Sequence, residues 1–135
     1  MDTLDPQQRS ARMALIRSKN TKPELVVRRL VHALGYRYRL HRCDLPGTPD
    51  LVFAARSKVI FVHGCFWHRH VGCALARLPK SRGDFWVPKL EGNAERDKRN
   101  MRALRRLGWG VMTIWECQLR DTPQLESRIR RFLDA

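Results

Sequence analysis

Two Cys and three His fall within eleven residues near the middle of the chain, around the end of an apolar run. They are His63, Cys65, His68, His70 and Cys73. Thiolate and imidazole form the ligand set that suits Zn(II), and their spacing here is typical of metal ligands. The alternative is a set of buried Cys and surface His beside a core strand. The density of metal-capable side chains favours the metal site.

A fourth ligand is expected from Cys117, which ends a second apolar run. If residues 59–62 and 109–116 form neighbouring strands of one sheet, their ends bring Cys65 and Cys117 to the same edge. The four side chains would then make a closed, tetrahedral, structural zinc site. Its expected ligands are Cys65, His70, Cys73 and Cys117.

His63 and His68 are left over for another role. A zinc-braced loop would hold His68, two residues before the ligand His70, in a fixed place, as catalytic positioning demands. The sequence alone also allows His63 or His68 to replace His70 as the zinc ligand.

The amino-acid composition of the chain indicates which class of molecule it binds. The chain has 135 residues, enough for one domain, with 27 Lys+Arg against 13 Asp+Glu, a formal charge of +14 and a pI near 11.0. This charge predicts salt-sensitive binding to nucleic acid. We see no apolar span of about 18 residues and no secretory leader, so we expect no membrane association. A thiolate site fits a reducing cytoplasm.

Asp50 is a candidate magnesium ligand. Pro49-Asp50 opens an expected strand over residues 50–53, and the strand over residues 58–62 follows after a short loop. Two such strands make a layout found in metal nucleases, where an acidic residue can hold Mg(II) against a scissile phosphate. By itself, Pro-Asp is also a turn signal.

Glu24 belongs to the start of the first expected helix. Thr21 can cap this helix, Pro23 suits its first turn, and Glu24 follows Thr21 at the spacing of a capping box, so capping is the simplest role for its carboxylate. The apolar residues expected to form the inner face of this helix, before Gly35 ends it, are Leu25, Val26, Leu30, Val31 and Leu34.

The remaining segments complete an α/β pattern. Residues 36–41 alternate as a half-buried strand does, and residues 123–133 predict a final helix. Residues 78–89 predict a basic, aromatic loop in which Trp86 could stack on a base or cap the core. The pattern of residues 90–107 predicts an amphipathic helix. Asp97 lies on this helix, and the pattern indicates that its carboxylate is exposed to solvent. The expected inward residues of the helix are Ala94, Met101, Leu104 and Leu107.

Residues 1–20 are polar and basic, and Met13 lies on their one thin apolar edge. We expect this segment to be an N-terminal arm that orders on a DNA backbone, with a merely mobile terminus as the alternative.

Four motifs together resemble one known family. They are His63-Gly64-Cys65-Phe66-Trp67-His68, Pro49-Asp50 upstream of it, Glu95-Arg96-Asp97 downstream, and Trp115-Glu116-Cys117 near the end. In this order they resemble the very short patch repair (Vsr) DNA mismatch endonucleases, and the likeness extends from Arg9 to about Leu119. The resemblance implies a restriction-endonuclease-like fold of the PD-(D/E)xK type over residues 21–135. Its central mixed sheet would be flanked by helices, and the usual E-x-K would be replaced by Phe61-Val62-His63.

The resemblance also implies an activity. Family members nick duplex DNA on the 5′ side of the T in a T:G mismatch, such as deamination of 5-methylcytosine leaves, and so start very short patch repair. The expected partner is mismatched double-stranded DNA, with mismatch-repair proteins as further candidates. We expect a monomer that works in the cytoplasm on the nucleoid.

The resemblance assigns the catalytic metal as Mg(II), bound by Asp50 and the main-chain carbonyl of Val62. Glu24 would hold water beside the metal from the first helix. A divalent cation can neutralise charge on the phosphate and stabilise the leaving oxygen.

The resemblance makes His68 the general base for the attacking water, oriented by Asp97, and places His63 near the metal and phosphate. Imidazole near its reference pKa of about 6.5 suits proton abstraction, and a carboxylate partner fixes its tautomer.

Mismatch reading in the family is by wedging into the base stack. Three residues match the aromatic residues that enter from the major groove: Phe66, Trp67 and Trp86. Met13 matches an N-terminal residue that approaches from the minor groove. A wobble pair is easier to unstack than a Watson–Crick pair, so deformation itself discriminates. The alternative for Phe66 and Trp67 is core packing behind the zinc loop.

The ligand run departs from one family pattern, since two residues, Val71 and Gly72, separate His70 from Cys73 where that pattern has one. The loop can absorb the extra residue. Two alternative functions remain: a restriction-like nuclease that cuts an unmismatched site, and a non-enzymatic, zinc-stabilised DNA-binding module.

Overall fold

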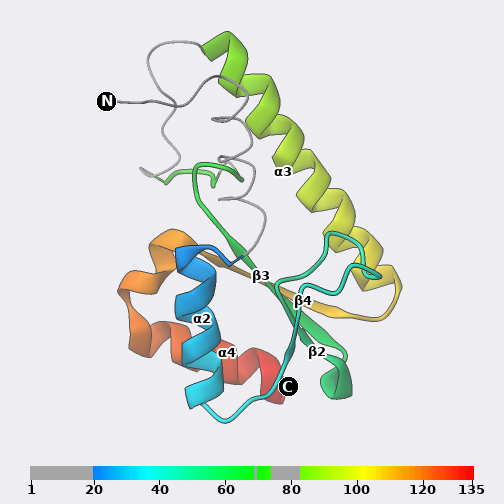
Figure 1. Ribbon diagram of the computed structural model, residues 1–135, viewed down its shortest axis with the longest axis vertical. Helices are drawn as coiled ribbons and strands as arrows, with labels where there is room; N and C mark the ends of the chain where they lie inside the picture. The colour runs from blue at the N-terminus through cyan, green and yellow to red at the C-terminus, as the bar shows by residue number, and fades with distance from the viewer. Residues whose placement is uncertain (1–19, 69, 74–82) are drawn as a thin grey trace.

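A four-stranded sheet lies at the centre of the computed structural model, which describes residues 20–68, 70–73 and 83–135 (Figure 1). Its strands, in the order β1-β2-β3-β4, are Arg39–Leu40, Leu51–Phe53, Lys58–His63 and Gly110–Trp115. β2 is antiparallel to both β1 and β3, whereas β4 is parallel to β3. The described residues therefore form one mixed α/β domain, as the sequence predicted.

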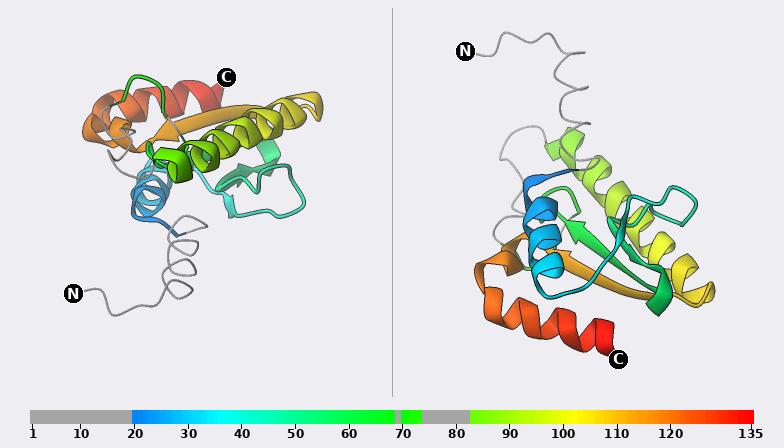
Figure 2. Two further views of the ribbon diagram at one scale, coloured as in Figure 1. Left: turned by 90° about the horizontal axis from the view of Figure 1, so that it is seen from above. Right: turned by 60° about the horizontal axis from the view of Figure 1, so that its bottom comes forward.

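Three α-helices within the described residues cover the sheet: α2 (Lys22–Ala33), α3 (Gly83–Arg106) and α4 (Thr122–Asp134). Short 3₁₀ helices, η1 (Ala54–Arg56) and η3 (Glu116–Arg120), follow β2 and β4. α2 and α4 pack on one face, and α3 packs on the other (Figures 1 and 2). α3 lies in the connection that joins the parallel strands β3 and β4, as a parallel pair requires.

β3 is buried on both faces, which explains its uninterrupted apolar sequence. Ile60 and Val62 pack with residues of α2 and α4, whereas Val59 and Phe61 pack beside Leu104 of α3. Successive side chains of a strand point to opposite faces, so one strand contributes to both halves of the core. His63, at the end of this strand, is consequently also buried.

The expected inner face of α2 was wrong in part. Val27 and Val31 are fully buried, whereas Leu25 and Val26 are 36% and 43% exposed. The buried residues of this helix are Glu24, Val27 and Val31, spaced by three and four positions. That spacing brings them onto one helical face, and Leu25 and Val26 fall beside it.

α3 begins earlier than predicted. Residues 83–89, expected as part of a loop, are helical, and Pro88 lies inside the helix. A proline removes one intrahelical hydrogen bond, yet the following 18 residues continue the helix. Leu107, expected to face inward, comes just after the helix and is 64% exposed.

Two strands are shorter than predicted. β1 contains only Arg39 and Leu40, and it ends before His41, which adopts a left-handed backbone conformation with φ of 48°. β4 ends at Trp115, so Cys117 lies in η3 rather than at the end of a strand. No helix in the described part of the chain is long and apolar enough to cross a membrane.

Leu104 and Leu107 offer a matched test of the packing. Leu104 is fully buried against β2 and β3, so Leu104→Ala should lower the free energy of unfolding by about 2–5 kcal/mol. Leu107→Ala, at an exposed position, should change it by less than about 0.5 kcal/mol. Urea denaturation of both variants measures the difference, and equal losses would contradict the assigned core.

Candidate active site

The parallel pairing of β3 with β4 brings distant parts of the sequence to one end of the sheet. Val62 lies opposite Ile114, and His63 lies opposite Trp115. The predicted adjacency of these strands is therefore confirmed. Cys65 and Cys117 each follow the paired ends by two residues, so they emerge at the same edge.

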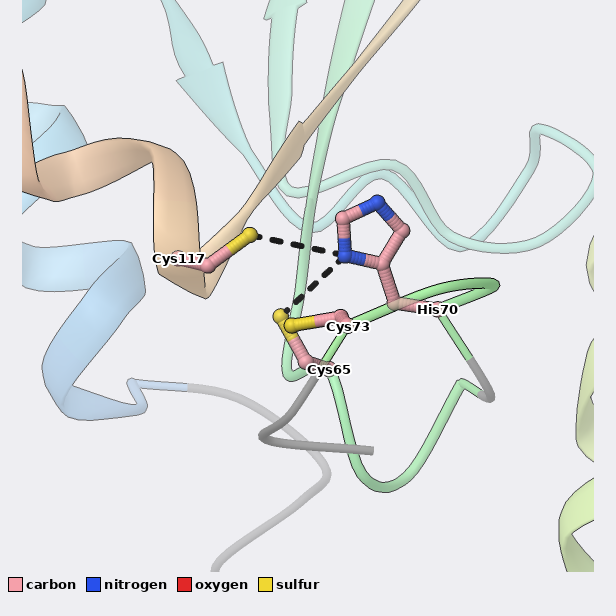
Figure 3. A group of neighbouring side chains, drawn as sticks. All are labelled: Cys65, His70, Cys73 and Cys117. Atoms are coloured by element: carbon pink, nitrogen blue, oxygen red, sulfur yellow. Dashed lines mark hydrogen bonds between the residues drawn. The ribbon is translucent and has the colours of Figure 1, made fainter. Parts of the chain in front are cut away.

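Four side chains at this edge could together hold a metal ion: Cys65, His70, Cys73 and Cys117. Each offers one ligand atom, and these atoms all lie within 4.8 Å of one another. Figure 3 shows the three sulfurs and the imidazole turned toward one centre. The Nδ1 atom of His70 lies 3.5 Å from the Sγ atoms of both Cys65 and Cys117. The predicted ligand set is thus brought together, with His70 rather than His63 or His68 in the group.

The loop that carries these residues is closed by main-chain hydrogen bonds. The amide of His70 donates to the carbonyl of Cys65 at 3.0 Å, and the amide of Cys73 donates to the carbonyl of His70 at 3.3 Å. Gly72 has a φ of 73°, a conformation that favours glycine. This turn accommodates the second residue between His70 and Cys73.

Burial disfavours the ionised, thiolate form of Cys65 in the sulfur cluster. It raises the pKa of the Cys65 thiol to about 12, and neighbouring Cys117 and Cys73 contribute to that rise. At neutral pH this thiol therefore keeps its proton unless a cation offsets the charge of the sulfur.

His63, His68 and Asp97 form a second group at the same end of the sheet. Nδ1 of His68 lies 2.5 Å from a carboxylate oxygen of Asp97, and the same oxygen lies 4.0 Å from Nδ1 of His63. The two imidazole rings are stacked, with centroids 3.9 Å apart and planes 5° from parallel. The resemblance placed Asp97 beside His68, and the structure brings them together, whereas spacing alone suggested a solvated charge.

His63 is held as a neutral imidazole. Burial, together with the adjacent His68, lowers its pKa to about 3, and Asp97 acts in the opposite direction. Its Nδ1 atom is buried and has no hydrogen-bond partner among the described residues. His63 and His68 open onto a cavity of about 600 Å³, whose other lining residues include Asp97, Lys98, Met101 and Trp115.

Asp50 is anchored to the strand that carries His63. Its Oδ2 atom accepts a hydrogen bond of 2.7 Å from the amide of Val62. Burial and the nearby Glu24 carboxylate raise the pKa of Asp50 to about 7, while the hydrogen bond from Val62 and the charge of Arg28 act in the opposite direction. Asp50 is thus hydrogen-bonded to the residue that precedes His63 at the end of β3.

Glu24 does more than cap its helix. The amide of Glu24 donates to Oγ1 of Thr21 at 3.3 Å, as predicted, but its carboxylate accepts from the amide of Asn20 at 3.1 Å rather than from Thr21. The side chain is 1% exposed and pairs with Arg28. A carboxylate that only capped the helix could stay exposed to solvent, so the burial of Glu24 indicates a further role.

His41 is a site residue that the sequence did not indicate. Its Nε2 atom lies 3.0 and 2.9 Å from the two carboxylate oxygens of Glu24. Glu24, His41 and Asp50 form a third group whose ligand atoms lie within 4.8 Å of one another. The alternation over residues 36–41 marked His41 only as the last position of a strand, so no local signal could have found it.

The predicted wedge residues are only partly described. Phe66 and Trp67 are half-buried on the loop after β3 and meet edge to face, with ring centroids 5.1 Å apart and planes at 78°. The carbonyl of Trp67 accepts a hydrogen bond of 3.1 Å from the side chain of Asn93. Trp86 lies on α3, but its side chain is outside the described residues, and so is Met13.

Comparison with known proteins shows the family to which the chain belongs. The family model described as "DNA mismatch endonuclease Vsr" matches residues 1–74. The "Type II nicking enzyme V.XorIIP" of Xanthomonas oryzae pv. oryzae is 56% identical over 133 residues, which are 98% of this chain and 97% of that protein. The "DNA mismatch endonuclease Vsr" of Escherichia coli K12 is 40% identical over 124 residues, 92% of this chain and 79% of that protein. The chain therefore belongs to the Vsr family and is a DNA endonuclease.

Proposed function

We propose that this endonuclease nicks one strand of duplex DNA on the 5′ side of the T in a T:G mismatch and so starts very short patch repair. The observation that carries the proposal is that two groups are attached to neighbouring residues at the end of β3. Asp50 is bonded to Val62, and the next residue, His63, is stacked on His68. A candidate metal-binding carboxylate and a candidate base are thereby brought to one strand end, as phosphodiester hydrolysis requires.

Asp50 and the carbonyl of Val62 are the proposed Mg(II) ligands, with Glu24 holding water beside them. The N–H and C=O of a strand residue point to the same edge of the strand. Since the Val62 amide donates to Asp50, its carbonyl faces the same side. When bound there, Mg(II) supplies charge neutralisation for the phosphate and the leaving oxygen. The arrangement is consistent with the PD-(D/E)xK-type fold that we propose for the domain.

His68 is the proposed general base. Its Nδ1 atom faces Asp97 at 2.5 Å, so an N–H donated there leaves the Nε2 lone pair free to accept a proton from the attacking water. Asp97 then also stabilises the protonated ring. His63, neutral because of its burial, can offer the phosphate a hydrogen bond without adding a charge to the site.

Zn(II) is the proposed occupant of the Cys/His group, with a structural role. Tetrahedral zinc with the usual bond lengths to sulfur and nitrogen separates these ligand atoms by about 3.6 Å. The two sulfur-to-nitrogen distances at His70 are 3.5 Å, which fits this geometry. All four positions are supplied by protein, so no open position is left for catalysis at this group.

The proposed wedge residues are Phe66, Trp67, Trp86 and Met13. The proposed DNA-contacting arm is formed by residues 1–20. The formal charge of +14 supports an extended contact with the phosphate backbone. Two further predictions concern the setting of the protein. It is expected to work as a monomer on the nucleoid in the cytoplasm, and mismatch-repair proteins are candidates for recruiting it.

A second candidate function is cleavage of an unmismatched, specific site. The relative from Xanthomonas favours it, because that protein is described as a type II nicking enzyme. Matched T:G and T:A duplexes in the same sequence separate the two functions. Equal nicking would favour the second, whereas nicking confined to T:G supports the proposal.

Asp50→Asn should reduce Mg(II)-dependent nicking of a T:G duplex by at least about a hundredfold, because the amide removes the charge that binds the metal. Binding of the mismatch, measured by gel shift in the absence of Mg(II), should be unchanged. Asp44→Asn, at an exposed aspartate, is the matched control and should nick normally. A fully active Asp50→Asn protein would rule out the assigned metal ligand.

Asp50 should also make stability depend on pH. Its pKa is raised on folding, so the folded protein keeps a proton that the unfolded chain releases, and stability falls as pH rises from about 4 to about 7. Without Mg(II), Asp50→Asn should therefore melt several degrees higher than wild type at pH 8, a gain on the order of 1 kcal/mol or more. The gain should shrink at pH 5.5.

Asp44→Asn serves as the control in the same melts. Its carboxylate is exposed, and hydrogen bonding to Arg42 lowers the pKa of Asp44, so the substitution should bring no gain at pH 8. If Asp50→Asn melted at the wild-type temperature at both pH values, Asp50 would carry no unfavourable charge in the folded protein.

Cys117→Ser tests the zinc site. Loss of one of four ligands should lower the bound zinc measured by atomic emission well below one ion per chain, and it should lower the melting temperature. The matched control is Cys43→Ser, because Cys43 is exposed and lies outside the group. Full zinc content in Cys117→Ser would refute this ligand assignment.

A further inference from the structure

His41 connects to both carboxylate residues of the proposed magnesium site. Its imidazole Nε2 reaches Glu24 at 2.9 Å, and its amide donates to the carbonyl of Asp50 at 3.3 Å. We propose that the His41 imidazole supplies a nitrogen ligand to the divalent metal at this site, so that the site binds Mn(II) more tightly than Mg(II). This inference rests on the proposed placement of the catalytic metal at Asp50.

The spacing of the ligand atoms supports direct coordination. Neighbouring ligands of an octahedral ion with metal–ligand bonds of about 2.1 Å are about 3.0 Å apart. The distances from Nε2 of His41 to the Glu24 carboxylate are 2.9 and 3.0 Å, and the Asp50 oxygen completes a group within 4.8 Å. Only small movements are needed to close these atoms around an ion.

The backbone holds His41 in an unusual conformation. Its φ of 48° lies in the left-handed region, which is uncommon for a residue other than glycine. Such a conformation is unfavourable and persists only where the surroundings determine it. Here the side chain is fixed by Glu24 and the amide by Asp50. His41 is therefore held in this conformation by contacts with both carboxylate residues of the proposed site.

The simpler alternative is that His41 only donates a hydrogen bond to Glu24. That carboxylate already has a cationic partner, because Arg28 pairs with it. Nη2 of Arg28 also lies 3.4 Å from Nε2 of His41, where it could serve as a donor to an unprotonated ring nitrogen. An imidazole is therefore not required to neutralise Glu24. His41 belongs to one potential ligand group with Glu24 and Asp50, so its Nε2 atom could bind a metal ion there in place of its hydrogen bond.

An imidazole ligand changes which ion the site prefers. Mg(II) is served best by oxygen ligands and water, whereas first-row transition ions also accept imidazole nitrogen. Mn(II) takes oxygen ligands readily and is the first member of that series. A site built from two carboxylates and one imidazole should therefore hold Mn(II) more tightly than Mg(II).

Mn(II) binding to the zinc-loaded protein tests this inference without any DNA. The probe is the electron paramagnetic resonance of free Mn(II) during titration, with Mg(II) affinity obtained by competition. His41→Gln keeps a hydrogen-bonding side chain but removes the imidazole. It should weaken Mn(II) binding by about tenfold or more and Mg(II) binding by less than about threefold. His32→Gln, at an exposed histidine on α2, is the matched control and should bind like wild type.

A spin-echo measurement on the bound Mn(II) asks directly whether nitrogen coordinates it. Wild type and His32→Gln should show modulation from a directly bound ¹⁴N nucleus, and His41→Gln should lose it. The wild-type measurement needs no variant, so it decides the question even if His41→Gln fails to fold. Absence of ¹⁴N modulation in wild type, or its persistence in a folded His41→Gln protein, would overturn the inference.

Asp50→Asn separates this inference from the proposed function. If that variant binds Mn(II) as wild type does, the metal does not lie at Asp50 and the proposed function fails at its metal site. If Asp50→Asn loses Mn(II) while His41→Gln keeps wild-type affinity for both ions, the metal is placed correctly and only the role of His41 is wrong.

Discussion

The parallel pairing of β3 with β4 is the constraint on which both halves of the site depend. Opposing His63 to Trp115 sets the ends of the two strands level, so the segments that follow leave the sheet together. Cys65 and Cys117 meet for this reason, and the amide of Cys65 also donates to a carboxylate oxygen of Glu116, 51 positions later in the sequence. A shift of the register by one residue would turn His63 away from α3 and separate the sulfurs from one another.

Burial of charge gives the site a cost that the rest of the fold must offset. Asp50 and Glu24 lie close together with little access to water, and the first consequence is the raised pKa of Asp50. Arg28 balances Glu24, and the amide of Val62 donates a hydrogen bond to Asp50. Electrostatic strain of this kind is expected where a cation or a phosphate will bind. The same burial that weakens the free protein strengthens the attraction for a metal ion.

Local sequence patterns predicted the parts of the structure that local physics determines. The apolar run of β3, the Thr21 cap and the closely spaced sulfur and imidazole groups all depend on neighbouring residues. The role of Asp97 could not be derived this way, because its partner His68 lies 29 positions earlier and only the family resemblance joined them. His41 was missed for a similar reason, since its contact with Glu24 spans 17 positions. The inner face of α2 failed by one position, where apolar residues at 25, 26 and 27 made the periodicity ambiguous.

One indole connects the proposed structural metal to the proposed catalytic group. The ring of Trp115 stacks on His70, with centroids 4.1 Å apart and planes 5° from parallel, and it meets His63 edge to face at 5.2 Å. His63 is in turn stacked on His68. Interiors are closely packed, so a change in the position of His70 must be absorbed by the rings that contact it. The amide of His68 also donates to the carbonyl of Gly64, within the loop that the sulfur ligands close. The position of the Cys/His group therefore affects the position of His68, the proposed base, in two ways. One is contact between the stacked rings, and the other is the backbone of the loop. A metal that takes no part in the chemistry can in this way set the orientation on which the chemistry depends.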